Sequence, residues 1–393
     1  MSGSRRFFST PIFKMRFVAR PNRFLVHGRA PGRPRIEAFL PNPGRLRELL
    51  LPGATLYVTE SPDPGATRKT RFTAVAVERD GAPVLLHTHA TNAVARRLLE
   101  QRRVPTLEHA AIARAEAPVG RSRFDFLLRD AEGDLYLEVK SCTLFGNGVA
   151  MFPDAVTERG RRHLLELAEL ARDGVRAAVL FVVHTPNVRW FMPDYHTDLA
   201  FSRTLLDVRD RVRILPVSVT WRDDLTLARE ARLLEIPWAH IDREARDSGA
   251  YLLLLELEDA ARIEVGALGT VSFRRGHYVY VGSAMANLAA RMARHLRPHK
   301  TRHWHIDYLR PRAARVEALA VRASSRLECD LAHALGRVLE PGPRGFGCTD
   351  CACATHLFFS AAPPLDRRDV HDILERFRMR QPQIVCGSGS SPS

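Results

Sequence analysis

The stretch from Phe124 to Ser141 reads Phe-Asp-Phe-Leu-Leu-Arg-Asp-Ala-Glu-Gly-Asp-Leu-Tyr-Leu-Glu-Val-Lys-Ser. Residues 124–129 and 135–141 are typical of strands, and the break between them is rich in turn residues, so we expect a hairpin. Side chains alternate faces along a strand, which places Glu138 and Lys140 on one face. The expected turn sets Asp125 opposite Lys140, with Glu138 diagonal to Asp125.

Two carboxylates and an ammonium group on one sheet face suit the hydrolysis of a phosphodiester. Asp125 and Glu138 would hold Mg²⁺ or Mn²⁺ through oxygen, and the ion would polarise the phosphate and lower the pKa of a bound water. Lys140 would orient that water or stabilise the developing charge. The alternative is a surface strand on which Asp125 and Lys140 form an ion pair of little energetic value.

The elements predicted around the hairpin follow the order α-β-β-β-α-β. A helix over 90–103 precedes a strand over 110–118, which carries Glu116 as a further candidate metal ligand. After the hairpin, apolar residues at helical spacing predict a helix over 155–173 with Asp154 as its N-cap, and residues 175–184 predict a buried strand.

This order resembles the PD-(D/E)xK nuclease fold, with Asp125 and Glu138-Val-Lys140 as its signature. The resemblance narrows to the sugar fermentation stimulation protein A family over residues 15–221. It is carried by four blocks that match in order: Pro41-Asn-Pro-Gly-Arg-Leu46, Phe124-Asp-Phe126, Glu138-Val-Lys-Ser141 and Phe152-Pro-Asp-Ala-Val-Thr-Glu-Arg-Gly160. The resemblance implies an N-terminal OB-like barrel, a nuclease-like domain and DNA binding. Cleavage is implied only by the fold, since the role for which the family is named is regulatory.

The composition indicates a globular protein that binds a polyanion. The 393 residues carry a net charge of +15, and among 59 Lys and Arg only Lys14, Lys69, Lys140 and Lys300 are lysines. Residues 1–50 hold 11 Arg and Lys against two Glu, and residues 265–306 hold seven Arg and Lys, five His and no acid. Such segments suit nucleic acid, and the alternative is a solvated basic surface.

Membrane and secretory classes are not favoured by the sequence. No apolar run reaches the roughly 18 residues that a bilayer span requires, and residues 1–14 are too polar for a secretory signal. The six cysteines do not form a spaced disulfide framework. We therefore expect a cytoplasmic protein without a membrane partner.

Short runs of β character over residues 15–88, about five in number, predict a small barrel, and OB barrels bind oligonucleotides. Basic and amide side chains on and near these runs are the candidate phosphate contacts. They are Arg20, Asn22, Arg23, Arg45, Arg68 and Lys69. The segment 41–45 is alternatively only a rigid turn.

A second domain begins after a charged segment, 222–248, which we interpret as a linker or short helices. Strands are predicted around Gly249-Ala-Tyr251 and Tyr280-Val-Gly282, and helices over 285–297 and 326–339. On the first of these helices Asn287, Arg291 and His295 share one face.

These residues resemble the GIY-YIG endonuclease pattern. Together with Trp304-His-Ile-Asp-Tyr308 and Gly345-Phe-Gly-Cys-Thr-Asp-Cys351, they look like a GIY-YIG-like family of unknown function. The resemblance implies that Tyr251 or Tyr280 lies near the attacking water. It also implies that Arg291 contacts the phosphate, with His295 beside it, and that Glu328 holds a divalent ion. The alternative is that the tyrosines are structural and Arg291 only binds.

Four residues near the C-terminus form a candidate zinc site. Cys348, Cys351, Cys353 and His356 offer thiolates and an imidazole, the ligands that zinc prefers. The Cys-x-Cys step is not finger-like, and Cys329 is an alternative ligand. A buried cluster of reduced thiols is the competing interpretation.

The predicted architecture is therefore an α/β multi-domain chain. Its parts are an extension (1–14), an OB-like barrel (15–88), a PD-(D/E)xK nuclease-like domain (89–221), a linker (222–248), a GIY-YIG-like domain (249–362), and a helix with a disordered tail (363–393). The predicted function is DNA binding with metal-dependent phosphodiester hydrolysis. The alternatives are a non-catalytic DNA-binding regulator of sugar metabolism genes and an RNA-binding or RNA-processing protein.

Overall fold

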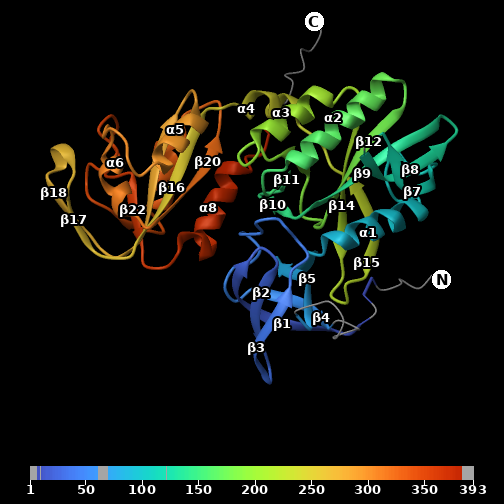
Figure 1. Cartoon of the computed structure of the whole chain (residues 1–393), viewed down its shortest axis with the longest axis horizontal. Coiled ribbons are helices and arrows are strands. Elements are labelled where there is room, and N and C mark those ends of the chain that lie inside the picture. The colour runs from blue at the N-terminus through green and yellow to red at the C-terminus, as the bar shows by residue number, and fades with distance from the viewer. Residues whose placement is uncertain (1–6, 9, 61–69, 121, 383–393) are drawn as a thin grey trace, which may run out of the picture.

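A computed structural model describes residues 7, 8, 10–60, 70–120 and 122–382. Figure 1 shows three parts along the chain: a barrel at the N-terminus, a central α/β domain and a C-terminal α/β domain. The chain is thus a multi-domain α/β protein, as expected. Among the described residues, no helix combines the length and the apolarity needed to cross a bilayer.

The N-terminal part is an OB-like barrel. Its strands are β1 (Ile12–Asn22), β2 (Leu25–Ala30), β3 (Arg33–Phe39), β4 (Thr55–Glu60), β5 (Phe72–Arg79) and β6 (Ala82–Leu85). They are ordered β3-β2-β1-β4-β5-β6, and a further β3–β5 pairing closes the sheet on itself. Since β1 begins at Ile12, the barrel starts within the stretch expected as an extension.

The central domain is built on a six-stranded mixed sheet in the order β15-β14-β12-β9-β8-β7. Helix α1 (Thr88–Glu100) precedes β7 (Ala111–Val119), β8 (Ser122–Asp130) and β9 (Gly133–Cys142). Helix α2 (Glu158–Arg172) leads into β12 (Arg176–Val183), and α3 (Leu199–Val208) leads into β14 (Arg213–Trp221). Short strands β10 (Leu144–Gly146), β11 (Val149–Phe152) and β13 (Trp190–Pro193) form a separate sheet.

The expected linker is wrong in part. Strand β15 (Leu227–Leu233) pairs antiparallel with β14 and forms the edge of the sheet, and α4 (Trp238–Glu244) follows it. The polar pattern misled because an edge strand exposes much of its surface to water. Helix α2 also starts later than expected: Thr157 caps it by accepting from the Gly160 amide, whereas Asp154 accepts from the amide of Leu46 in the barrel.

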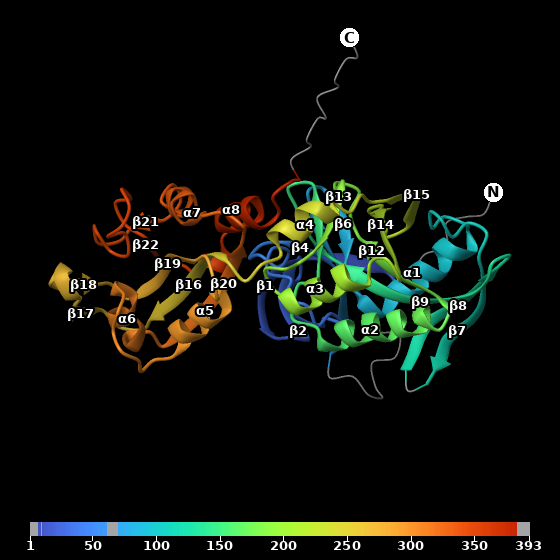
Figure 2. The same ribbon diagram turned by 90° about the horizontal axis from the view of Figure 1, so that it is seen from above.

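The C-terminal domain has helices on both faces of a five-stranded sheet. Strands β16 (Gly249–Leu257), β19 (Gly276–Ala284), β20 (Arg315–Arg322), β21 (Glu340–Pro341) and β22 (Leu357–Ser360) are ordered β20-β16-β19-β22-β21. Figure 2 shows α5 (Leu288–Leu296) and α6 (His305–Leu309) on one face, and α7 (Glu328–Leu335) and α8 (Arg368–Arg378) on the other. A hairpin of β17 (Ala261–Glu264) and β18 (Thr270–Phe273) extends from it.

Helix α8 joins the three parts, so it is not the separate C-terminal segment that was expected. Its apolar side, including Phe377, belongs to the core beneath α7. Its polar side reaches the other parts: Glu375 binds Arg79 of the barrel through two 2.8 Å contacts, and Arg378 binds Asp194 of the central domain at 3.1 Å.

A buried carboxyl at this junction makes stability depend on pH. Burial, aided by the nearby Asp154 carboxyl, raises the pKa of Glu48 from 4.5 to about 7. The folded state therefore binds the Glu48 proton more tightly than the unfolded state does, so stability falls as pH rises from about 4.5 through 7.

We expect Glu48→Gln to remove this dependence. Between pH 5 and pH 8 the wild-type protein should lose about 2–3 kcal/mol more of its free energy of unfolding than the variant loses. Urea unfolding of both proteins at the two pH values measures the difference. Parallel pH profiles of the two proteins would contradict the assignment of the proton to Glu48.

Candidate functional site

Asp125 and Glu138 lie directly opposite one another on adjacent strands, whereas the sequence predicted a diagonal arrangement. Strands β8 and β9 pair Phe126 with Leu137 and Asp130 with Gly133, so only residues 131 and 132 form the turn. Continuing this register sets Asp125 level with Glu138, not with Lys140 as expected. The error arose because the two-residue turn falls at 131–132, one position earlier than the turn that would pair Asp125 with Lys140, which shifts the pairing by two.

Asp125 is held by two donors that leave its carboxylate firmly oriented. The Asn92 amide of α1 donates to Oδ1 at 2.6 Å, and the backbone amide of Val139 donates to Oδ2 at 2.7 Å. Burial and the negative charge of Glu138 together raise the pKa of Asp125 above its usual value.

Glu138 is 5% exposed and sits between two donors. Lys140 Nζ lies 2.6 Å from Oε1, and His163 Nδ1 from α2 lies 2.5 Å from the same oxygen. Burial alone would raise the pKa of Glu138, but the hydrogen bond from His163 and the Lys140 charge outweigh it and lower the pKa. Glu138 is therefore ionised at neutral pH.

These contacts fit a divalent cation bound between the strands. Burial and then the charge of Glu138 raise the pKa of Asp125, and a hard cation bound by both carboxylates would relieve their repulsion while taking oxygen ligands. Asn92 and His163 hold the carboxylates in place, as partners of metal ligands do. Neither residue was predicted, because Asn92 lies 33 residues before Asp125 and His163 lies 25 residues after Glu138. Only the folding of the chain brings them to the hairpin.

Glu116 does not join this pair. It lies on β7 with φ +52°, its side chain is 55% exposed, and it forms an ion pair with Arg123 at 2.9 Å. The strand was predicted correctly, but the positive φ turns the backbone out of regular strand geometry at this residue.

Two of the barrel residues expected to contact phosphate, Arg20 and Asn22, instead bind the backbone of the barrel. The Arg20 guanidinium donates to the carbonyls of Arg23, Asn42 and Gly44 at 2.7–3.2 Å and also to that of Arg45, so it organises the 41–45 loop. The side chain of Asn22 accepts from the Phe24 amide.

Arg23 and Arg45 are exposed and make no ion pair among the described residues. They line an open cavity of about 730 Å³ that also includes Arg20, Arg47 and the single acid Asp366. Arg68 and Lys69 lie outside the described residues. The loop and its flanking strands thus present a basic hollow, with two free guanidinium groups.

In the C-terminal domain, three of the expected residues meet under α5. Tyr251 of β16 lies with its hydroxyl 3.0 Å from His295 Nε2, and Tyr280 lies beside Tyr251 with ring centroids 6.4 Å apart. Arg291 contacts the Trp304 ring at 4.3 Å and lowers the pKa of Tyr251, which burial raises overall. Gly282 leaves the space for this tyrosine, because a Cβ there would lie 2.5 Å from its Cζ.

The basic segment around Arg291 is partly neutralised by Asp307, which lies just beyond its end. Asp307 is 2% exposed and binds Lys300 at 3.0 Å and Arg294 at 3.1 Å, with His295 Nδ1 at 3.4 Å. These contacts, with backbone donors at 303 and 304, hold the pKa of Asp307 far below its usual range although burial opposes them. Lys300 is thus a core ion-pair partner of Asp307.

Glu328, on α7, lies close enough to Tyr251 and Tyr280 for its negative charge to help burial raise the pKa of both phenols. Tyr251 and Tyr280 belong to the core facing α5, whereas α7 packs on the opposite face. Glu328 Oε1 is 3.2 Å from His356 Nδ1, and Glu328 Oε2 accepts from the Ser283 hydroxyl.

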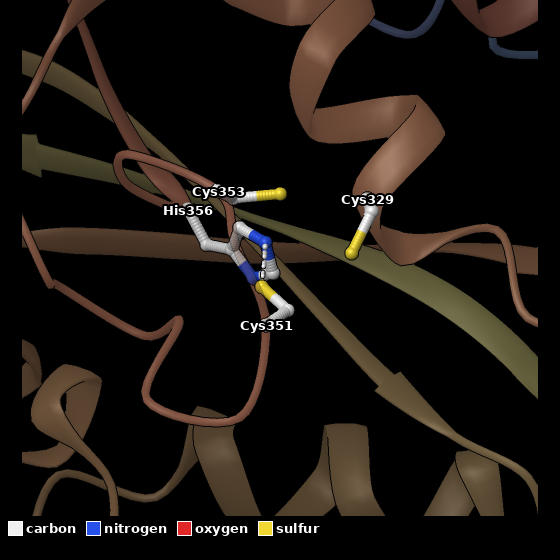
Figure 3. Close-up of side chains that lie close together, drawn as sticks. All are labelled: Cys329, Cys351, Cys353 and His356. Atoms are coloured by element: carbon white, nitrogen blue, oxygen red, sulfur yellow. Dashed lines mark hydrogen bonds between the residues drawn. The ribbon is translucent and has the colours of Figure 1, made fainter.

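The cysteine cluster has a different membership from the one predicted first. The side chains of Cys351, Cys353 and His356 converge with that of Cys329, the alternative ligand, and their ligand atoms lie within 4.8 Å of one another (Figure 3). Cys348 is buried in the same loop but does not belong to this group, although burial and then the neighbouring Cys351 and Cys329 raise the pKa of its thiol. No other group of three or more such ligands occurs among the described residues, and Asp125 and Glu138 form only a pair.

Comparison with known families agrees with the division of the fold. Residues 18–86 match the SfsA N-terminal OB domain, residues 89–224 match the sugar fermentation stimulation protein RE domain, and residues 250–379 match DUF123, a domain of unknown function.

Related proteins named as sugar fermentation stimulation proteins match about half of the chain, the part that holds the barrel and the central domain. A sugar fermentation stimulation protein homolog of Clostridium kluyveri is 38% identical over 52% of this chain and 87% of its own length. One from Methanothermobacter thermautotrophicus is 36% identical over 56% of this chain and 92% of its own. A solved structure, Pyrococcus furiosus SfsA in complex with Ca²⁺, is 31% identical and covers 59% of this chain and 99% of that one, with a TM-score of 0.53.

Proposed function

Because the chain belongs to the sugar fermentation stimulation protein family, whose barrel and nuclease-like domains it contains, we propose that it is a DNA-binding, metal-dependent phosphodiesterase. One observation carries the proposal: Asp125 and Glu138 stand level on adjacent strands, and Lys140 contacts Glu138 at 2.6 Å. Two oriented carboxylates beside an ammonium group suit phosphodiester hydrolysis.

Asp125 and Glu138 would hold Mg²⁺ or Mn²⁺, and the Ca²⁺ in the Pyrococcus relative supports a hard divalent ion for this fold. When bound, the ion supplies Lewis acidity to the phosphate and to a water. The residues of the chain position the reactants: Asn92 and Val139 orient Asp125, and His163 keeps Glu138 ionised. Lys140, which contacts Glu138 at 2.6 Å, would supply a positive charge to the attacking oxygen or to the phosphate.

DNA binding is proposed from the barrel. Arg23 and Arg45 stand free at the edge of the basic cavity, where a phosphate backbone would find two guanidinium groups and little acidic competition. Arg20 contributes indirectly, because its bonds to the 41–45 carbonyls set the position of Arg45.

Affinity for DNA should fall steeply with salt. Each phosphate neutralised by an arginine releases a counterion, so the logarithm of the binding constant falls by about 0.9 per phosphate per tenfold rise in salt. Arg23→Ala and Arg45→Ala should each reduce that slope by about one. Fluorescence anisotropy with a labelled duplex at several salt concentrations measures it. Arg35→Ala is the control, because Arg35 is exposed but already paired with Glu37 at 2.7 Å. A slope unchanged in both cavity variants would remove the barrel from the binding surface.

Cleavage of labelled DNA and RNA with Mg²⁺ or Mn²⁺ tests the catalytic part. Metal-dependent cleavage of DNA supports the proposal, and cleavage of RNA alone favours RNA processing. Binding to DNA without cleavage of either substrate favours the regulator of sugar metabolism genes.

A second reactive group is proposed in the C-terminal domain on the GIY-YIG resemblance. The His295 imidazole connects two groups: its Nε2 contacts the Tyr251 hydroxyl at 3.0 Å, and its Nδ1 lies 3.4 Å from the Asp307 carboxylate. Burial lowers the pKa of His295, so the neutral ring can accept the Tyr251 proton. Arg291, which is near enough to lower the pKa of Tyr251, would contact the phosphate. Glu328 as a divalent-ion ligand stays a prediction.

A further inference from the structure

The cysteine cluster brings together side chains from two segments of the C-terminal domain. Cys329 stands in the first turn of α7, while Cys351, Cys353 and His356 belong to the loop between β21 and β22. Figure 3 shows the Cys329 sulfur pointing from the helix toward the three side chains of the loop.

We propose that Cys329, Cys351, Cys353 and His356 bind one structural Zn²⁺ and that Glu328 orients the zinc-bound histidine. The proposal concerns the C-terminal domain and stands independently of nucleic-acid cleavage at the hairpin.

The donor set and its dimensions fit zinc. Three thiolates and one imidazole make the closed Cys₃His set of structural sites, and bond lengths near 2.3 Å to sulfur and 2.0 Å to nitrogen place the ligand atoms of a tetrahedron about 3.5–3.8 Å apart. The Cys351 Sγ to His356 Nε2 distance is 3.5 Å, and all four donor atoms lie within 4.8 Å of one another. Small side-chain rotations would therefore complete the tetrahedron.

The histidine is oriented as a zinc ligand normally is. His356 directs Nε2 toward Cys351 and Nδ1 toward Glu328 Oε1, 3.2 Å away. A carboxylate on the second nitrogen fixes the tautomer and the ring plane of a metal-bound histidine. Glu328 is itself anchored, because its other oxygen accepts from Ser283 at the end of β19.

Zinc would give the loop an anchor that its own backbone lacks. The 15-residue segment 342–356 contains no helix or strand. Three backbone hydrogen bonds lie within it, joining Gly345 to Ala354, Phe346 to Pro343 and His356 to Phe346. Linking 351–356 to the first turn of α7 would tie this loop to the helix and hold Glu328 in place.

Two side chains near the cluster, Cys348 and His333, are used to test which residues bind the zinc. Cys348 lies within the same loop but is 5% exposed outside the cluster, so it serves as the control cysteine. His333 lies one turn along α7, with Nε2 3.7 Å from Cys353 Sγ, and is a further donor that could replace a lost ligand.

The first experiment uses the full-length protein purified under reducing conditions. We expect elemental analysis to give one zinc per chain. Protein stripped with a chelator should rebind Zn²⁺ with a dissociation constant of about nanomolar or tighter, and Co²⁺ should give the absorption of tetrahedral thiolate coordination. Absence of zinc together with micromolar or weaker rebinding would overturn the proposal in favour of a reduced thiol cluster.

The second experiment locates the ligands. Cys329→Ala, Cys351→Ala and Cys353→Ala should each reduce zinc content well below one per chain and remove part of the Co²⁺ charge-transfer band, whereas Cys348→Ala should retain full zinc. Because a ligand variant can unfold, circular dichroism is recorded, and chelation of the wild type provides the same loss without mutation. Zinc retained in Cys329→Ala but lost in Cys348→Ala would refute this ligand set.

The third experiment isolates Glu328. Glu328→Gln should keep one zinc per chain but weaken its binding by about 10- to 100-fold, the usual effect of losing a carboxylate behind a metal-bound histidine. Asp330→Asn, in the same turn of α7 and outside the ligand group, should leave zinc affinity unchanged. Unchanged zinc affinity in Glu328→Gln would overturn the orienting role and leave that residue free for another ion.

Discussion

Replacing Glu138 with glutamine should reduce phosphodiester cleavage by about a hundred- to a thousandfold, equivalent to roughly 2.7–4 kcal/mol of transition-state stabilisation. The amide matches the carboxylate in size and can still accept from Lys140 and His163, which donate to Oε1 at 2.6 and 2.5 Å. What it loses is the negative charge that would hold the cation. Cleavage rates and Mn²⁺ affinity of the variant measure the effect.

Glu116→Gln is the matched control. It removes a carboxylate from the neighbouring strand, but Glu116 is 55% exposed and paired with Arg123, so cleavage should change by less than about twofold. DNA affinity should survive both changes, since the proposed phosphate contacts lie on the barrel. Full activity in Glu138→Gln, with loss in a variant of Tyr251 instead, would transfer the catalytic role to the C-terminal domain.

Arg79→Ala should lower the free energy of unfolding by about 3 kcal/mol, because it leaves the Glu375 carboxylate buried with only the longer 3.7 Å contact to Arg368. The two side chains are only 6% and 14% exposed and meet through two 2.8 Å contacts at the junction of the barrel and α8. The guanidinium also stacks on Phe145 of the central domain at 4.6 Å. Urea unfolding followed by circular dichroism gives the loss.

Two further variants separate charge from packing. Glu78→Ala removes the neighbouring residue on β5, whose pair with Lys14 is exposed, and should cost less than about 1 kcal/mol. The double variant Arg79→Met, Glu375→Leu should recover much of the stability, because apolar residues of similar volume commonly replace a buried pair without loss. A double variant as unstable as Arg79→Ala would show that packing, and not the stranded charge, dominates.

Local patterns carried much of the fold. The period-two runs of the hairpin and the 3.6-residue periodicity of 155–173 each depend on neighbours a few residues apart, so the strands and helix α2 were predictable. The spacing of Arg291 and His295 placed both on α5 for the same reason. Where a local signal was weak, as in the exposed edge strand β15, the prediction failed.

The sequence by itself determined which residues carry charge, sulfur and imidazole, and the secondary structure on which most of them lie. Only the tertiary structure decided which of them meet. His163 of α2 contacts Glu138 of β9, and Arg20 donates hydrogen bonds to the 41–45 loop. In the cluster, Cys329 takes the place predicted for Cys348. Spacing along the chain predicts contacts within one element, whereas contacts between elements depend on how the apolar faces of sheet and helices pack together.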